Sequence, residues 1–196
     1  MKAKLTLMLL LLCCATIPFA QAKSKEKSDS KASVSGEMDH LFSGVEREFV
    51  GAADAMPEDK YDFAPTNGEF KGVRTFSQQV KHVAAVNYLV FSGMLGEKPA
   101  VDTGGENGPD SMKSKADIMK FLRDSFALGH RAYGAITPQN EVAPIKNPFG
   151  GKSPATRVGM GALIVGHCFD HYGQMVEYLR MNGIIPPASR PEPPKK

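Results

Sequence analysis

The sequence predicts an all-α fold, a four-helix bundle that extends over about residues 37–189. Two observations support this prediction. Apolar side chains recur at steps of three and four residues in four long segments, and this is the period of one helix face. Stretches that contain glycine and proline separate these segments, and no segment alternates between apolar and polar residues as a half-buried strand does.

The first 22 residues have the pattern of a secretory signal peptide. Lys2 and Lys4 give a basic start, an apolar run follows over residues 5–19, and Ala20-Gln21-Ala22 fits the small-x-small cleavage pattern. We therefore expect cleavage after Ala22 and export to a periplasmic or extracellular location. A retained membrane anchor is the weaker alternative, because the apolar run is shorter than the roughly 20 residues of a spanning helix.

A lipid anchor at Cys13 or Cys14 is a further alternative, but Leu12 is too bulky for that processing signal.

The predicted cleavage would remove two of the three cysteines and two lysines. Loss of two lysines lowers the formal net charge from +3 to +1, so the mature chain offers no electrostatic case for binding nucleic acid. Cys168 is then the sole cysteine, and the mature chain cannot form an intramolecular disulfide.

The two ends of the mature chain are expected to lie outside the bundle. Residues 23–36 are rich in Lys, Ser and Glu with almost no apolar residue, which is typical of a disordered linker. A basic membrane-surface patch fits less well, because Glu26 and Asp29 interrupt the lysines. Residues 190–196 form a tail rich in proline and lysine that cannot continue a helix.

The first two helices are expected over about residues 37–55 and 75–95. The apolar stripe of the first helix consists of Met38, Leu41, Phe42, Val45, Phe49 and Ala52, and Pro57 ends it. The stripe of the second consists of Phe76, Val80, Val83, Val86 and Val90, and Gly96 follows as a stop signal. The valines also suit a strand, but a run of this length without turn residues favours a helix.

The third helix should begin near Ser114, whose hydroxyl can cap the first turn, with Asp117 three residues later as in a capping box. It should end before Pro138. The fourth is expected over about residues 156–181, with Gly183 as its C-terminal stop.

The links between the helices predict a crossover. Residues 96–113 and 139–153 form links that are longer than the usual 2–8 residues between antiparallel neighbours in a bundle. Residues 103–109 are glycine-rich, but they lack the GK[ST] end and the preceding strand of a phosphate-binding loop. We interpret them as a flexible loop.

A metal site is predicted from three histidines. His167 and His171 are four residues apart on one helix face, where Cβ atoms lie roughly 5–6 Å apart, so both rings can reach one ion through bonds of about 2.0–2.1 Å. His82 shares a stripe with Gln79 and Val86 and should point into the bundle. A lone interior histidine is usually hydrogen-bonded to a neighbour, but three would all need buried partners, which favours ligation.

Several short motifs together resemble the DinB-like family over about residues 37–189. They are Pro57-x-x-Lys60-Tyr61-Asp62-Phe63-x-Pro65, Arg74-Thr75-Phe76, Val80-Lys81-His82-Val83-Ala84, His167-x-x-Asp170-His171-Tyr172-Gly173-Gln174, Tyr178-Leu179-Arg180 and Pro186-Pro187-x-Ser189. The resemblance implies a four-helix bundle with up-down-down-up helices. It also implies one divalent metal ion, zinc or nickel, held by residues that match His82, His167 and His171.

The remaining polar candidates have weaker claims. His130 is expected at the surface or beside the site rather than as a ligand, and His40 in solvent. Cys168 is expected to be a small buried residue. Asp170 points away from the ligand face, so it cannot act as the glutamate of His-Glu-x-x-His proteases does, but it can orient a histidine. Tyr172 and Gln174 either line the site or pack, and packing is slightly favoured.

Two functions fit these residues. The first is a metal-dependent enzyme with an open three-histidine site, a thiol transferase or a hydrolase, that acts on a small-molecule substrate. The family resemblance supports the transferase, whereas export argues against it, because the thiol cofactors of such transferases are cytosolic. The second is a non-catalytic metal-binding or stress-response module of the cell envelope, with a fourth protein ligand closing the site. A homodimer is compatible with either function, and no membrane span is expected after cleavage.

Overall fold

The structure, a computed structural model, describes residues 32–191 and consists mainly of four helices. They are α1 (Val34–Ala55), α2 (Phe76–Leu95), α3 (Lys115–Gly134) and α4 (Arg157–Met181). Two 3₁₀ turns, Glu58–Lys60 and Pro187–Ser189, and two strands, β1 (Pro144–Ile145) and β2 (Ala155–Thr156), complete the described elements. The strands pair antiparallel within the link before α4. The predicted all-α bundle is therefore confirmed.

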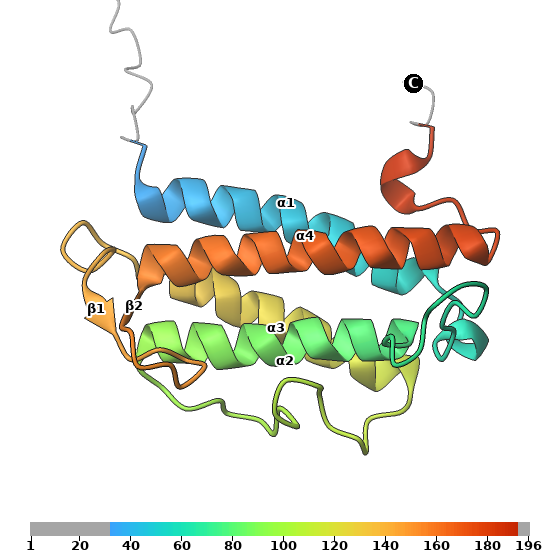
Figure 1. Cartoon of the computed structure of the whole chain (residues 1–196). Coiled ribbons are helices and arrows are strands. Elements are labelled where there is room, and N and C mark those ends of the chain that lie inside the picture. Colours follow the sequence, from blue (N-terminus) through green and yellow to red (C-terminus); the bar gives the residue numbers. More distant parts are fainter. Residues whose placement is uncertain (1–31, 192–196) are drawn as a thin grey trace, which may run out of the picture. The chain divides into compact units, whose positions relative to one another are not determined.

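The helices run up, down, down and up (Figure 1). The chain between α2 and α3 follows the length of the bundle, so these two helices run in the same direction as neighbours, and α1 lies beside α4 in the same way (Figure 1). This chain, residues 96–113, is the crossover that its length predicted. The pair α2 and α4 runs antiparallel, so the beginning of α2 lies beside the later turns of α4.

The first helix begins earlier than the sequence indicated. α1 starts at Val34 rather than near Glu37, because the Ser33 hydroxyl accepts a hydrogen bond of 3.0 Å from the Gly36 amide and caps the first turn. The prediction of a disordered linker is therefore wrong for residues 34–36. The signal peptide, linker residues 23–31 and tail residues 192–196 lie outside the described residues.

The other helix ends follow the predicted signals. Ser114 caps α3 by accepting from the Asp117 amide, and Thr75 and Gln78 form a reciprocal capping box at the start of α2. Gly96 and Gly183, both with φ of 73°, follow α2 and α4 in the left-handed conformation that favours glycine. These caps set where the helices begin and end.

The core joins all four helices through one apolar cluster. Its aromatic centre is formed by Phe42, Phe91, Phe126 and Tyr133, with ring centroids 5.0–5.4 Å apart in the neighbouring pairs. The Tyr133 hydroxyl donates to the Gly161 carbonyl over 2.8 Å, so this buried phenol is hydrogen-bonded. Among the described residues, no helix is long and apolar enough to cross a membrane.

Candidate metal centre

The antiparallel packing of α2 against α4 brings the three predicted histidines together. His82 from α2 meets His167 and His171 from α4, and one nitrogen from each ring lies within 4.8 Å of the others. His82 and His171 are buried and His167 is partly buried. Since His167 and His171 are one helical turn apart, a single ring from α2 is enough to complete a three-nitrogen set.

The spacing of these nitrogens suits a single divalent ion. The Nε2 atoms of His82 and His167 lie 3.1 Å apart. Two nitrogens bound tetrahedrally to one ion, each at 2.0–2.1 Å, would be about 3.3 Å apart. Three imidazoles are also a usual protein ligand set for zinc and suit nickel as well. The three residues can therefore hold a metal ion.

The outer nitrogen of His82 is held by the crossover chain. Its Nδ1 hydrogen-bonds the backbone carbonyl of Glu106. Because a carbonyl only accepts, Nδ1 carries the proton and Nε2 presents its lone pair to the centre of the triad. The crossover packs closely here: a Cβ at Gly108, which has φ of 75°, would lie 2.6 Å from the Lys81 Cβ. Residues 103–109 form a loop, as interpreted, and this loop also orients a candidate ligand; its flexibility stays a prediction.

The outer nitrogen of His171 begins a chain of side-chain hydrogen bonds. Its Nδ1 bonds Oε1 of Gln79, and Nε2 of Gln79 donates to Oε1 of Gln174 over 2.8 Å. Nε2 of Gln174 then donates to Asp170 over 3.1 Å. The chain ends on a carboxylate, so it favours the tautomer of His171 with a proton on Nδ1 and a free Nε2 lone pair.

This chain shows what two residues of the motif do. Packing was slightly favoured for Gln174, but Gln174 carries a hydrogen bond between the two helices. Asp170, which we interpreted as able to orient a histidine, reaches His171 of its own helix, and only through two glutamines. Tyr172 is half-buried and packs against the core.

His167 differs from the other two rings. Its Nδ1 is buried and has no hydrogen-bond partner among the described residues. The protein therefore orients His82 and His171 from outside the triad but leaves His167 to be positioned by packing and by its neighbours in the triad.

The surroundings keep all three imidazoles neutral near pH 7. Burial lowers the pKa of His167 to about 4 and that of His171 to about 3, and the neighbouring histidines add to both shifts. Burial also lowers the pKa of His82. Metal binding requires neutral imidazole, so the site does not have to release protons before it takes an ion at neutral pH.

The other candidates do not join the triad. His130 lies between Asp39 and Glu46, with nitrogen to oxygen distances of 2.6 and 2.9 Å, and joins α3 to α1. His40 is exposed, as expected. Cys168 is fully buried, and burial raises the pKa of its thiol far above the usual value, which leaves it unreactive.

Two groups around the triad were not identified from the sequence. The Glu106 carbonyl belongs to the backbone, so no residue type marks it. Gln79 could have been predicted from the sequence, because it lies three residues before His82 on the same helix face. A buried amide at that position needs a hydrogen-bond partner, and a histidine of the triad can be that partner.

Comparisons with known proteins agree with this fold. The family model of the DinB superfamily matches residues 41–175. The structure is similar to the crystal structure of a DinB-like protein from Bacillus cereus ATCC 10987, with a TM-score of 0.63 and 17% sequence identity. That match covers 78% of this chain and 95% of the other, and at this identity it shows the fold alone. No curated protein matches the chain.

Proposed function

The chain belongs to the DinB superfamily, and from this premise we propose that it is a metal-dependent enzyme in which His82, His167 and His171 bind one zinc or nickel ion. The observation that carries the proposal is the orientation of the ligands. Two of the three rings have their outer nitrogens fixed by Glu106 and Gln79, and residues that act this way around metal sites increase ligand basicity and metal affinity.

The ligand count favours catalysis over a purely structural role. Within residues 32–191, no fourth histidine, cysteine, aspartate or glutamate joins the group. Catalytic zinc sites use three protein ligands and leave a position for water or substrate, whereas structural sites use four. The fold also has its own apolar core and does not depend on an ion to bury side chains.

The reaction we propose is activation of a water or a small thiol for attack on a small-molecule substrate. A bound divalent ion supplies Lewis acidity, which lowers the pKa of the nucleophile. The chain contributes the neutral imidazoles that hold the ion and the two acceptors that orient them. A hydrolase and a thiol transferase both use this arrangement, and the choice between them depends on the nucleophile.

The second function we consider is a non-catalytic metal-binding or stress-response module of the cell envelope. The hydrogen-bond chain that ends on the exposed Asp170 suits tight binding of an ion as well as catalysis. This module would differ from the enzyme in one respect: no coordination position of its ion would be open to an exchangeable water or a substrate.

We also propose that the protein is exported. The apolar run after Lys2 and Lys4 and the cleavage pattern at residues 20–22 support this. N-terminal sequencing of the protein recovered from the periplasm or the medium should start at Lys23. Recovery of a chain acylated at Cys13 or Cys14 would make it a lipoprotein instead, and a full-length chain that stays in the cytoplasm would contradict export.

An experiment with cobalt distinguishes the enzyme from the module. The mature protein is loaded with Co²⁺, and its visible absorption spectrum is recorded while a small thiol is added. An open position should give a new thiolate charge-transfer band and a changed ligand-field spectrum, with the thiol bound at one equivalent. A cobalt spectrum that does not respond to thiol, azide or imidazole would show a closed site and favour the module.

A screen with the zinc and nickel forms then tests turnover directly. Small esters and amides test hydrolysis, and electrophiles presented together with a thiol test transfer. The test variant is His167→Ala, which removes a candidate ligand. The matched control is His40→Ala, which changes an exposed histidine outside the triad. Turnover that persists in His167→Ala would place the reaction elsewhere.

A further inference from the structure

A polar pocket lies between the start of α2 and the crossover chain. It has a volume of about 430 Å³ and is lined by Gly72, Arg74, Gln78, Lys81, Asn107 and Asp110. Two cations and one carboxylate give it a formal net charge of +1. Every side chain in this lining is polar or charged, so the pocket suits a hydrophilic ligand and not an apolar one.

Lys81 gives the pocket a buried positive charge. Its residue is only 6% exposed, and its Nζ donates one hydrogen bond, to the Pro109 carbonyl over 3.1 Å. No carboxylate of the described residues lies within ion-pairing distance of Lys81. A buried lysine is normally paired, and an ammonium group has three donors, so two remain for a ligand.

Arg74 adds a second unpaired cation. Its Nη2 donates to the Asn107 side chain over 3.2 Å, and it too makes no ion pair within the described chain. A planar guanidinium can bind the two oxygens of a carboxylate or a phosphate at once. Gln78 and Asn107 add neutral amide groups to the lining. The pocket therefore presents donors from both of its walls.

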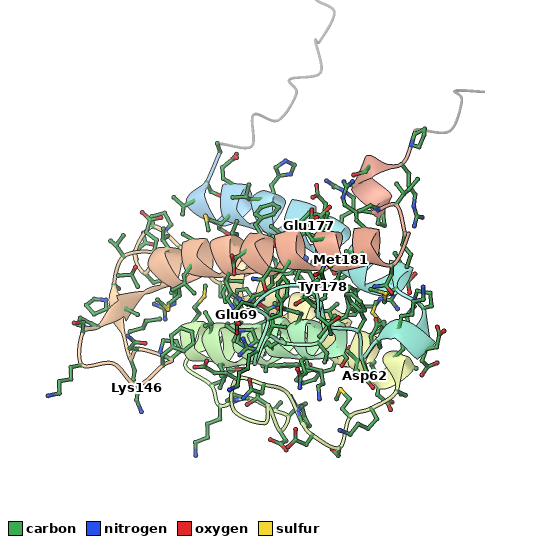
Figure 2. The ribbon with its side chains drawn as sticks, turned by 45° about the vertical axis from the view of Figure 1, so that its right-hand side comes forward. Asp62, Glu69, Lys146, Glu177, Tyr178 and Met181 are labelled. Carbon is green, nitrogen blue, oxygen red and sulfur yellow. The ribbon has the colours of Figure 1, made fainter. Side chains whose placement is uncertain are left out.

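The pocket adjoins the candidate metal centre. Lys81 and Gln78 are one and four residues before His82 on α2, and Asn107 follows Glu106, whose carbonyl holds the His82 ring. The Tyr178 hydroxyl donates to the Arg74 carbonyl over 3.1 Å and ties this wall to α4. Figure 2 places Tyr178 on a different side of α4 from its exposed neighbour Glu177.

We propose that this pocket binds the carboxylate or phosphate group of a small molecule through Lys81 and Arg74. The pocket would then select anionic substrates, and hold the rest of the molecule toward the histidines. The assignment of the anion to a substrate rests on the proposed function, whereas the anion site itself does not.

The test measures binding of two probes, inorganic phosphate and succinate, to the mature protein by calorimetry at low ionic strength. Lys81→Met and Arg74→Gln should each weaken binding about tenfold or more, because each removes a charge-assisted hydrogen bond. Lys81→Arg keeps the charge and should retain most of the affinity. Tighter binding of phosphate would assign a phosphorylated ligand, and tighter binding of succinate a carboxylate.

Lys146→Met is the matched control. Lys146 is an exposed lysine in the link before α4, is not part of the pocket lining, and projects away from the bundle (Figure 2). Its loss should leave anion binding unchanged. Helical circular dichroism of every variant shows whether it is folded, and Arg74, which is only partly buried, tests the pocket if Lys81→Met does not fold.

The metal ligands separate this proposal from the proposed function. His167→Ala should lose the metal but still bind the anion, whereas Lys81→Met should lose the anion but keep its metal. Anion binding that disappears in His167→Ala would mean that the anion binds the ion and would overturn the pocket. Binding that is equal in wild type, Lys81→Met and Arg74→Gln, or absent in wild type, would overturn it as well.

Discussion

Nδ1 of His171 in α4 is hydrogen-bonded to Oε1 of Gln79 in α2, so one candidate ligand is oriented by the helix that supplies another. Gln79 is itself held by Gln174, one turn beyond His171. The relationship couples the packing of the two helices to the direction of the His171 lone pair. It also makes Gln79 a positioning residue that can be tested apart from the ligands.

Gln79→Ala should weaken metal binding by about 10–100-fold, the usual cost of losing such an outer hydrogen bond. Competition with a metal-binding indicator measures the change. Gln79→Glu keeps an acceptor for Nδ1 and should restore most of the affinity, and exposed Gln139→Ala is the control. Equal affinity in wild type and Gln79→Ala would show that packing alone orients His171.

Gly129→Ala should destabilise the bundle although alanine favours a helix. A Cβ at this position in α3 would lie 2.4 Å from a ring carbon of Phe42 and 2.7 Å from one of Phe91. Overpacking of this kind costs about 1–3 kcal/mol, more than the 0.5–1 kcal/mol gained from helix propensity. Urea unfolding measures the difference.

Gly166→Ala is the matched control for that experiment. This glycine lies in α4, and no atom would be within 4 Å of an added Cβ. The substitution should stabilise the protein by about 0.5–1 kcal/mol. Stabilisation by Gly129→Ala to the same extent would contradict this prediction and show that the rings of Phe42 and Phe91 shift to make room for the added Cβ at little cost in free energy.

His130 should stabilise the protein more at low pH than at high pH. Burial alone would lower the pKa of His130, but hydrogen bonds to Glu46 and Asp39 outweigh burial and raise it. The added stability is fully present below the unfolded pKa of about 6.5 and is lost as the pH rises through the folded pKa. His130→Gln should therefore cost more in the free energy of unfolding at pH 6 than at pH 9.

Comparison of urea midpoints for wild type and His130→Gln at both pH values checks this, since the histidines of the triad contribute equally to both proteins. A larger cost at pH 9 would reverse the sign and show that His130 is bound in its neutral form.

Chelation should leave the fold intact while lowering the melting temperature. An ion at a hundredfold excess over its Kd adds about 2.7 kcal/mol. For a domain of this size that corresponds to a shift of about 5–10 °C. Helical circular dichroism should persist without metal, because the core joins all four helices independently of the triad. Complete loss of the helical signal would make the ion structural.

The sequence predicted those features that are encoded in local patterns. The four helices, the caps at Ser114 and Gly96 and the grouping of the histidines depend on spacing within a few residues or on shared helix faces. The missed features depend on the tertiary structure. The Glu106 carbonyl reaches His82 only because the crossover packs against α2. The three extra residues at the start of α1 depend on a cap at Ser33, which we did not identify because Ser33 lies in a stretch with the polar composition of a linker.

We propose that His82, His167 and His171 together hold one ion, and elemental analysis of the mature protein, purified without affinity metals and dialysed against excess zinc or nickel, measures this. We expect one ion per chain in wild type and in His40→Ala. Alanine substitution of any of the three histidines should leave less than about a tenth of that, since each removes one of only three ligands. One ion per chain retained in all three variants, or equal loss in His40→Ala, would contradict it.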